Sequence, residues 1–149
     1  MLVLRTCDEN MRSHGGFQWP ESGHVECSDW RADYNCGNGL HGLPEGKGDG
    51  NLLNWDPSAK WLVVDVADCD IMHGQGDMIG KCKFPRGNVV HCGDMDSALN
   101  YMQSAGVVLD GAVGVKTTAG DRGTATAGDR GTATAGDRGA ATAGDGGTA

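Results

Sequence analysis

Residues 118–147 read TAGDRGTATAGDRGTATAGDRGAATAGDGG, and this stretch nearly repeats itself every eight residues. The full units are KTTAGDRG (116–123), TATAGDRG (124–131), TATAGDRG (132–139) and AATAGDGG (140–147). The alternation of Thr and Ala is compatible with a strand. Gly-Asp-Arg-Gly is typical of a turn, because glycine adopts positive φ at little cost and aspartate bonds to nearby backbone amides. The period therefore predicts short strands joined by tight turns.

Two units would make one flattened coil, so the segment has room for about two coils. Thr would then stack on Thr and Ala on Ala at about 4.8 Å. The predicted fold class is an α+β, mainly β, N-terminal domain with one clear helix, followed by a short β-solenoid of about two 16-residue rungs. The alternative is a flexible tail, because little apolar surface offsets an ordering cost of roughly 1–2 kcal/mol per residue.

The composition changes abruptly near residues 113–116, which predicts two domains, 1–113 and 114–149. Trp, Met, His and Cys all lie before that point, whereas the rest is Gly, Ala, Thr, Asp, Arg and one Lys. A helix is predicted over 96–105, capped by Asp94 or Asp96 and ended by Gly106. The other elements predicted in the first domain are strands over 1–6, 61–66 and 107–115, and a hairpin of 79–84 with 88–92 around a turn at 85–87.

The formal net charge of −8 falls on the first domain, because acids and bases balance from Lys116 onward. An acidic body does not attract nucleic acid or an anionic membrane, but it favours a protein partner with a basic surface. No apolar stretch approaches the roughly 20 residues that cross a bilayer, and the first residues lack the pattern of a secretory signal. The expected location is therefore cytoplasmic, with no direct contact to nucleic acid or membrane.

The unit Ala-Gly-Asp-Arg-Gly-Thr-Ala-Thr resembles the octapeptide of bacterial ice-nucleation proteins over residues 116–149. The resemblance implies β-solenoid geometry, but two rungs are too few to imply the activity. The positions that match the Thr-x-Thr of that family are Thr124, Thr126, Thr132 and Thr134. Aspartate stands where the family has a stacked tyrosine, at Asp121, Asp129, Asp137 and Asp145. The first domain, with CGNGLHG and GKCKFPRGNVVHCGD, is similar to uncharacterised phage and bacterial domains that precede such repeats.

The main functional hypothesis is a non-enzymatic interaction protein without a cofactor. In its phage-type version, the acidic domain inhibits a basic protein and the repeat segment oligomerises. A last rung without a cap exposes unpaired backbone groups, so a homo-oligomer through this solenoid edge is expected. The alternative is a fragment of a structural repeat or fibre protein. The predicted interaction residues are Thr124, Thr126, Thr132 and Thr134 on the strands, and Ala143, Gly144, Asp145 and Thr148 on the last rung.

A different hypothesis is a zinc-containing module or enzyme in the first half of the chain. The candidate ligands are His24 and Cys27, which form one close pair, with Cys36 and His41 further along. Zinc favours four such ligands in a tetrahedron, usually supplied as two close pairs, and no Cys-x-x-Cys occurs here. Without an export signal the six cysteines are expected to be free thiols.

Overall fold

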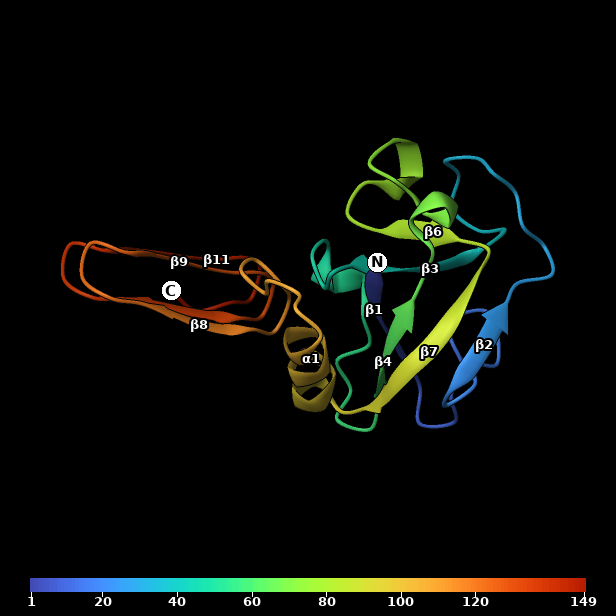
Figure 1. Ribbon diagram of the computed structural model, residues 1–149, viewed down its shortest axis with the longest axis horizontal. Helices are drawn as coiled ribbons and strands as arrows, with labels where there is room; N and C mark the ends of the chain where they lie inside the picture. Colours follow the sequence, from blue (N-terminus) through green and yellow to red (C-terminus); the bar gives the residue numbers. More distant parts are fainter.

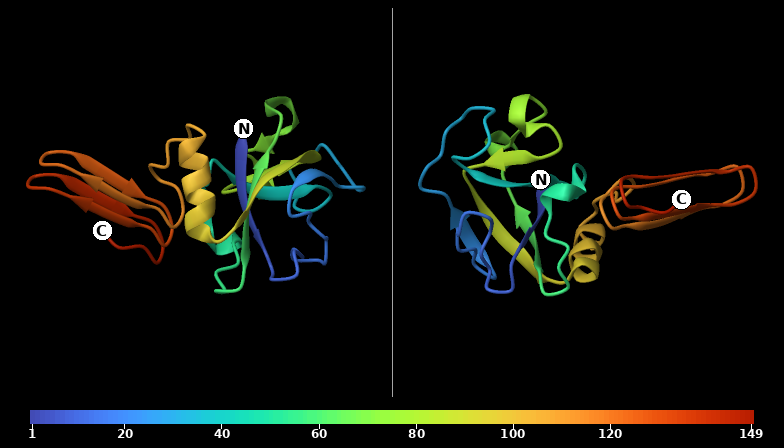
Figure 2. Two further views of the ribbon diagram at one scale, coloured as in Figure 1. Left: turned by 60° about the horizontal axis from the view of Figure 1, so that its bottom comes forward. Right: turned by 180° about the vertical axis from the view of Figure 1, so that it is seen from behind.

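The computed structural model describes residues 1–149, a mainly-β chain with one α-helix (Figure 1). We call residues 1–115 the body and residues 116–149 the arm, which projects to one side of the body (Figures 1 and 2). The helices include none with the length and apolar surface needed to cross a membrane. The elements are β1 (Leu2–Cys7), β2 (Gly23–Glu26), β3 (Leu40–Pro44), η1 (Gly50–Leu52), β4 (Lys60–Asp65), η2 (Asp68–Asp70), β5 (Met72–His73), η3 (Gly76–Met78), β6 (Cys82–Phe84), β7 (Arg86–Gly93), α1 (Met95–Ser104), β8 (Lys116–Ala119), β9 (Thr124–Ala127), β10 (Thr132–Ala135) and β11 (Ala140–Ala143).

Seven strands form the antiparallel sheet of the body, in the order β2-β7-β4-β1-β3-β6-β5. The two strands predicted at 1–6 and 61–66 are its centre, because β1 pairs with β4 along its whole length. Residues Trp61–Val64 of β4 are all buried, so this run faces a core on both sides of the sheet. Leu62 and Val64 pack in one hydrophobic cluster with Phe84, and Trp61 and Val63 pack in another.

The single helix lies close to where the sequence predicts it. Asp94 caps it, since its Oδ1 accepts a hydrogen bond of 2.8 Å from the Ser97 amide. Gly106 follows its end with a φ of 94°, a conformation that favours glycine. Ala98, Leu99 and Met102 form its buried face, which covers the second cluster of the body.

Two predictions for the body are wrong. The expected hairpin of 79–84 with 88–92 does not form, because β6 pairs with β3 and β5 while β7 pairs with β2 and β4. Pro85 instead joins two strands that lie in different parts of the sheet. Residues 107–115 contain no strand either; Val113 and Val115 are buried in the connection between the helix and the arm.

The fold class predicted for the arm needs correction: it is not a β-solenoid. The arm forms two separate sheets of two strands each, β8 with β10 and β9 with β11, both parallel. A solenoid is a continuous stack in which each repeat packs between neighbours. Here no strand has a partner strand on both sides, so the structure is a mainly-β chain with an antiparallel main sheet and a small two-layered extension. The arm is nevertheless ordered in four strands and is not a structureless tail.

Candidate functional site

The strands of the arm separate Ala from Thr. Ala125, Ala127 and Ala133 are at most 3% exposed and pack with Ala112 and Val115 in a third, smaller hydrophobic cluster. The methyl groups are small, so the two sheets approach closely and the inside of the arm holds no large side chain. The buried alanine layer therefore separates the two outer faces of the arm.

The outer faces carry the predicted threonines. Thr124 and Thr134 are exposed, and Thr126 and Thr132 are half-buried. On each face one threonine lies beside another, because Thr126 pairs with Thr142 and Thr134 with Thr118. Paired strands lie about 4.8 Å apart, so each face presents two neighbouring threonines to water.

We call residues 116–131 the first pass of the arm and residues 132–147 the second pass. Hydrogen bonds to aspartate side chains join the two passes. Asp121 Oδ1 accepts a 2.8 Å hydrogen bond from the Asp137 amide, and Asp129 Oδ1 accepts one of 2.8 Å from the Asp145 amide. Sequence reasoning missed this role, although an aspartate at the same place in every unit was a usable signal. A carboxylate that accepts from an amide gives a strong, directional bond, so these residues fix the register between passes.

The turns of the arm use arginine where glycine was predicted to supply positive φ. The φ angles of Arg122, Arg130 and Arg138 are 61°, 55° and 58°. Gly146, in the fourth unit, has a φ of 66° at the same position. The glycines of the motif serve another purpose: a Cβ on Gly136 or Gly144 would collide with the aspartate carboxylate of the preceding pass.

One turn of the arm contacts the body through Asp129 and Arg130. Asp129 Oδ2 accepts a 2.7 Å hydrogen bond from the Gly50 amide in η1. The guanidinium of Arg130 lies 4.6 Å from the ring centroid of Trp55. Trp55 in turn donates from Nε1 to the Gly50 carbonyl at 2.7 Å. This junction fixes one turn of the arm on the body.

The predicted interaction residues between positions 143 and 148 lie at the outer edge of the arm. Ala143 ends β11 and is half-buried, whereas Gly144, Asp145 and Thr148 are exposed. Thr148 begins a further pass, because its carbonyl accepts a 2.8 Å bond from the Ala133 amide. β11 pairs only with β9, so its other side is an open strand edge.

The direction of the backbone amides in β11 shows which of them have no partner strand. Ala140 donates to Gly123 and Gly144 donates to Ala127, both toward the first pass. Amides alternate in direction along a strand, so those of Ala141 and Ala143 face away from the arm. The carboxylates of Asp137 and Asp145 also accept no hydrogen bond, unlike those of Asp121 and Asp129 one pass earlier.

The predicted zinc ligands do not form a cluster. No group of three or more His, Cys, Asp or Glu side chains is arranged to hold a metal ion. His24 is on the outside of β2, with Nε2 3.2 Å from Glu26 Oε2. Cys27, Cys36 and His41 line a pocket that does not include His24. Zinc on these four residues remains a prediction that this geometry does not favour.

The cysteines are all free thiols. Burial raises the pKa of Cys7 to about 11 and that of Cys82 to about 12, so both stay protonated at neutral pH and supply no thiolate. Cys36 is exposed, and Lys81 Nζ lies 3.0 Å from its sulfur. Burial, helped by the charges of Lys81 and Arg5, lowers the pKa of His41 to about 4, so its ring is neutral at pH 7.

Residues 1–101 match a protein-family model described as Domain of unknown function (DUF7666). The chain belongs to this family. Its members carry no described activity in that name, so the DUF7666 match identifies the body of the protein without assigning it a function. No solved structure matches the chain.

Curated relatives of this DUF7666 protein are ice nucleation proteins. InaU of Pantoea ananas is 41% identical over 104 residues, which cover 68% of this chain and 10% of that protein. A relative from Pseudomonas syringae is 43% identical over 103 residues, covering 69% and 9%. One from Xanthomonas campestris pv. translucens is 40% identical over 112 residues, covering 75% and 7%. The chain thus spans about a tenth or less of the length of these relatives.

These matches change three expectations. The aligned stretches are longer than the arm, so the ice-nucleation resemblance extends beyond residues 116–149 into the body. The expected cytoplasmic location is wrong in view of relatives that are ice nucleation proteins; it rested on the lack of a secretory-signal pattern and of a long apolar stretch. The phage-type inhibitor has no support from them, whereas a structural repeat protein agrees with them.

Proposed function

We propose that this protein is a non-enzymatic structural repeat protein whose arms join edge to edge and thereby extend the threonine-bearing faces. The observation that carries the proposal is the open edge of β11, where the amides of Ala141 and Ala143 point away from the arm. An unpaired strand edge is a template for another strand.

The occupant of this edge in the proposal is a second copy of the chain. Two copies related by a twofold axis would each present the same edge, which is the commonest arrangement in homodimers. Thr148 already pairs with β10 at Thr132, so the contact would form mainly along β11. The acidic body, with its charge of −8, would stay outside the contact.

The assembly test uses the full chain and compares two proline variants. Ala143→Pro removes an amide at the open edge, and Val108→Pro removes an amide in an exposed connection, where Val108 is 70% exposed. Light scattering over a range of concentrations should give a mass above the monomer for the wild type and Val108→Pro, and a monomer mass for Ala143→Pro. A monomeric wild type, or equal masses for all three proteins, would refute edge pairing.

Ice nucleation by the assembled protein is the second proposed activity, favoured by the names of the curated relatives and by the paired threonines. Side-by-side hydroxyls at a regular spacing offer water an ordered array, and assembly enlarges that array. A single chain has too small a face, so activity should rise steeply with concentration.

Droplet-freezing temperatures test this second step. The double variant Thr126→Val and Thr142→Val keeps the shape of one face but removes its hydroxyls, and Ser104→Ala removes an exposed hydroxyl from the body as a control. The wild type and the control should freeze droplets at higher temperature than buffer, and the double variant should approach buffer. Equal freezing by all proteins, with equal masses in solution, would refute the role of the threonines.

A further inference from the structure

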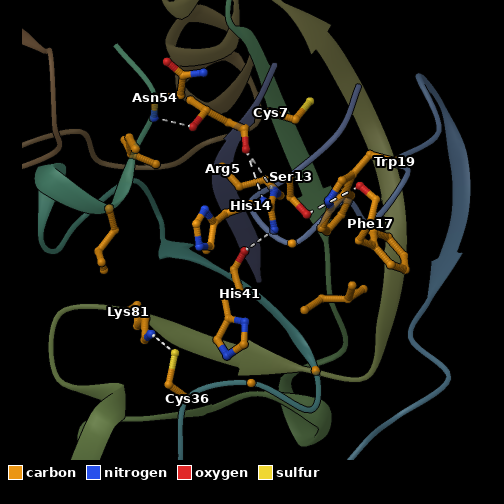
Figure 3. A pocket seen from close by; sticks show the side chains of 18 of the residues that line it. Arg5, Cys7, Ser13, His14, Phe17, Trp19, Cys36, His41, Asn54 and Lys81 are labelled. Carbon is orange, nitrogen blue, oxygen red and sulfur yellow. Dashed lines mark hydrogen bonds between the residues drawn. The ribbon is translucent and has the colours of Figure 1, made fainter. Parts of the chain in front are cut away.

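The body contains a pocket that the arm does not use. It has a volume of about 880 Å³ and is lined by residues of β1 and β3, by the loop after β1, and by the loop before β3. Figure 3 shows Arg5 at its centre, with His41 and the Cys36–Lys81 pair below and Trp19 to one side. The edge contact proposed above does not explain a hollow of this kind.

Arg5 is a positive charge without an acidic partner. Its guanidinium donates to backbone carbonyls only: Nη1 to His41 at 2.8 Å, and Nη2 and Nε to Thr6 at 3.1 and 3.3 Å. It stacks 4.0 Å from the centroid of the Trp19 ring. A guanidinium has five N–H groups, so two remain unused, and no carboxylate forms an ion pair with this charge. Burial accordingly lowers its pKa to about 10.

The surroundings of Arg5 are positive, in contrast to the acidic body as a whole. Lys81 and Arg12 also line the pocket, and Lys81 has only the sulfur of Cys36 as a partner. The two acidic residues of the lining are Asp8 and Asp29. Asp8 accepts from two backbone amides of its own loop, and Asp29 from the Asn38 side chain at 3.4 Å. Neither neutralises Arg5.

Two further polar atoms in the wall have no partner. They are Nε1 of Trp19 and Nε2 of His41, both buried and both in side chains that line the pocket. A buried polar atom without a hydrogen bond is unfavourable, so the wall behind the pocket is polar at these two atoms and not uniformly apolar. Phe17, Leu40 and Leu53 supply an apolar part of the lining.

We propose that this pocket binds a small organic anion, whose carboxylate or phosphate group contacts the free N–H groups of Arg5 while Lys81 supplies a second positive charge. Arginine presents its N–H groups in a fork that matches both oxyanions. The apolar side of the pocket would hold the remainder of the ligand. The DUF7666 body would thereby be a ligand-binding domain attached to a structural arm.

The experiment titrates the full chain with two probes, inorganic phosphate and benzoate, at constant ionic strength and with chloride as the reference anion. The readout is the Trp19 indole N–H in a ¹H–¹⁵N spectrum, assigned by its loss in Trp19→Phe. The indole N–H of Trp55, which bonds to the Gly50 carbonyl, is an internal reference outside the pocket. A saturable shift of Trp19 with either probe supports the site and names its chemistry.

Two variants locate the charge that is needed. Arg5→Gln and Lys81→Gln should each weaken binding at least tenfold, whereas Lys116→Gln, which removes one exposed charge from the arm, should leave it unchanged. If Arg5→Gln fails to fold, Lys81→Gln alone carries the comparison. Absence of a saturable shift with both probes, or equal weakening by Lys116→Gln, would overturn the proposal.

Discussion

The body and the arm reach order by different means. The body buries large side chains on both faces of a seven-stranded sheet, such as Phe84 and Leu62 in one cluster and Trp61 in the other. The arm buries alanines, and its strands and turns are joined by backbone bonds and aspartate carboxylates. The comparison shows that a segment with few apolar groups can be ordered when each of its turns repeats the same bonding pattern.

The strongest test of this comparison is a loss of volume in each region. Phe84→Ala removes a fully buried ring from the body and should lower the free energy of unfolding by about 3–5 kcal/mol. Ala133→Gly removes only a methyl group from the arm and should cost about 1 kcal/mol. Urea denaturation followed by tryptophan fluorescence measures both. Similar losses in the two variants would mean that the arm has a core like that of the body.

The next test adds a methyl group between passes of the arm. Gly136→Ala would bring Cβ against the Asp121 carboxylate and 2.7 Å from its amide nitrogen, and overpacking of this kind costs about 1–3 kcal/mol. Gly120→Ala is the matched control, because nothing lies within 4 Å of its Cβ position. Thermal unfolding by circular dichroism should separate the two. If both variants melt alike, close stacking of the turns is not needed for the arm.

A smaller effect of opposite sign is expected inside the arm at Thr117. This residue stands where later units have alanine, and its buried Oγ1 has no hydrogen-bond partner. Thr117→Ala should therefore raise the free energy of unfolding by about 1 kcal/mol. Thr118→Ala, on the exposed face, should change it by less than about 0.5 kcal/mol. A destabilised Thr117→Ala variant would show that the inner layer of the arm is not apolar.

The smallest expected difference concerns the junction between the two regions. Arg122→Gly and Arg130→Gly both relieve a positive φ, but only Arg130→Gly loses the contact with Trp55. Arg130→Gly should thus be less stable than Arg122→Gly by about 0.5–1 kcal/mol, the value of an exposed cation–π contact. The difference should vanish in a Trp55→Leu background. A difference that persists there would place the contribution of Arg130 elsewhere.

The sequence was most informative where a pattern is local. The Thr-Ala-Thr-Ala stretches at 124–127 and 132–135 are strands and the Gly-Asp-Arg-Gly stretches are turns. The helix near 96–105 also follows from its own cap and its own stop residue. Such features depend on residues a few positions apart, so one sequence suffices to predict them.

Partner choice between distant strands was not predictable in the same way. Pro85 suggested a hairpin, but β6 and β7 bond to other strands because each completes a different part of the sheet. The prediction of a β-solenoid for the arm was wrong for a related reason. A periodic sequence sets the spacing of the turns, but it does not set how many strands join one sheet. The cluster expected from His24, Cys27, Cys36 and His41 likewise depended on loops whose paths no local pattern sets.

The sequence by itself determined the eight-residue period, the small side chains within it and the concentration of negative charge in residues 1–115. Only the tertiary structure decided that Asp129 and Arg130 join the arm to the body and that Arg5 lies without an acidic partner in a pocket. The physical reason is distance along the chain. Gly50 and Asp129 are separated by 79 positions, and their contact is favourable only once both regions have folded around it.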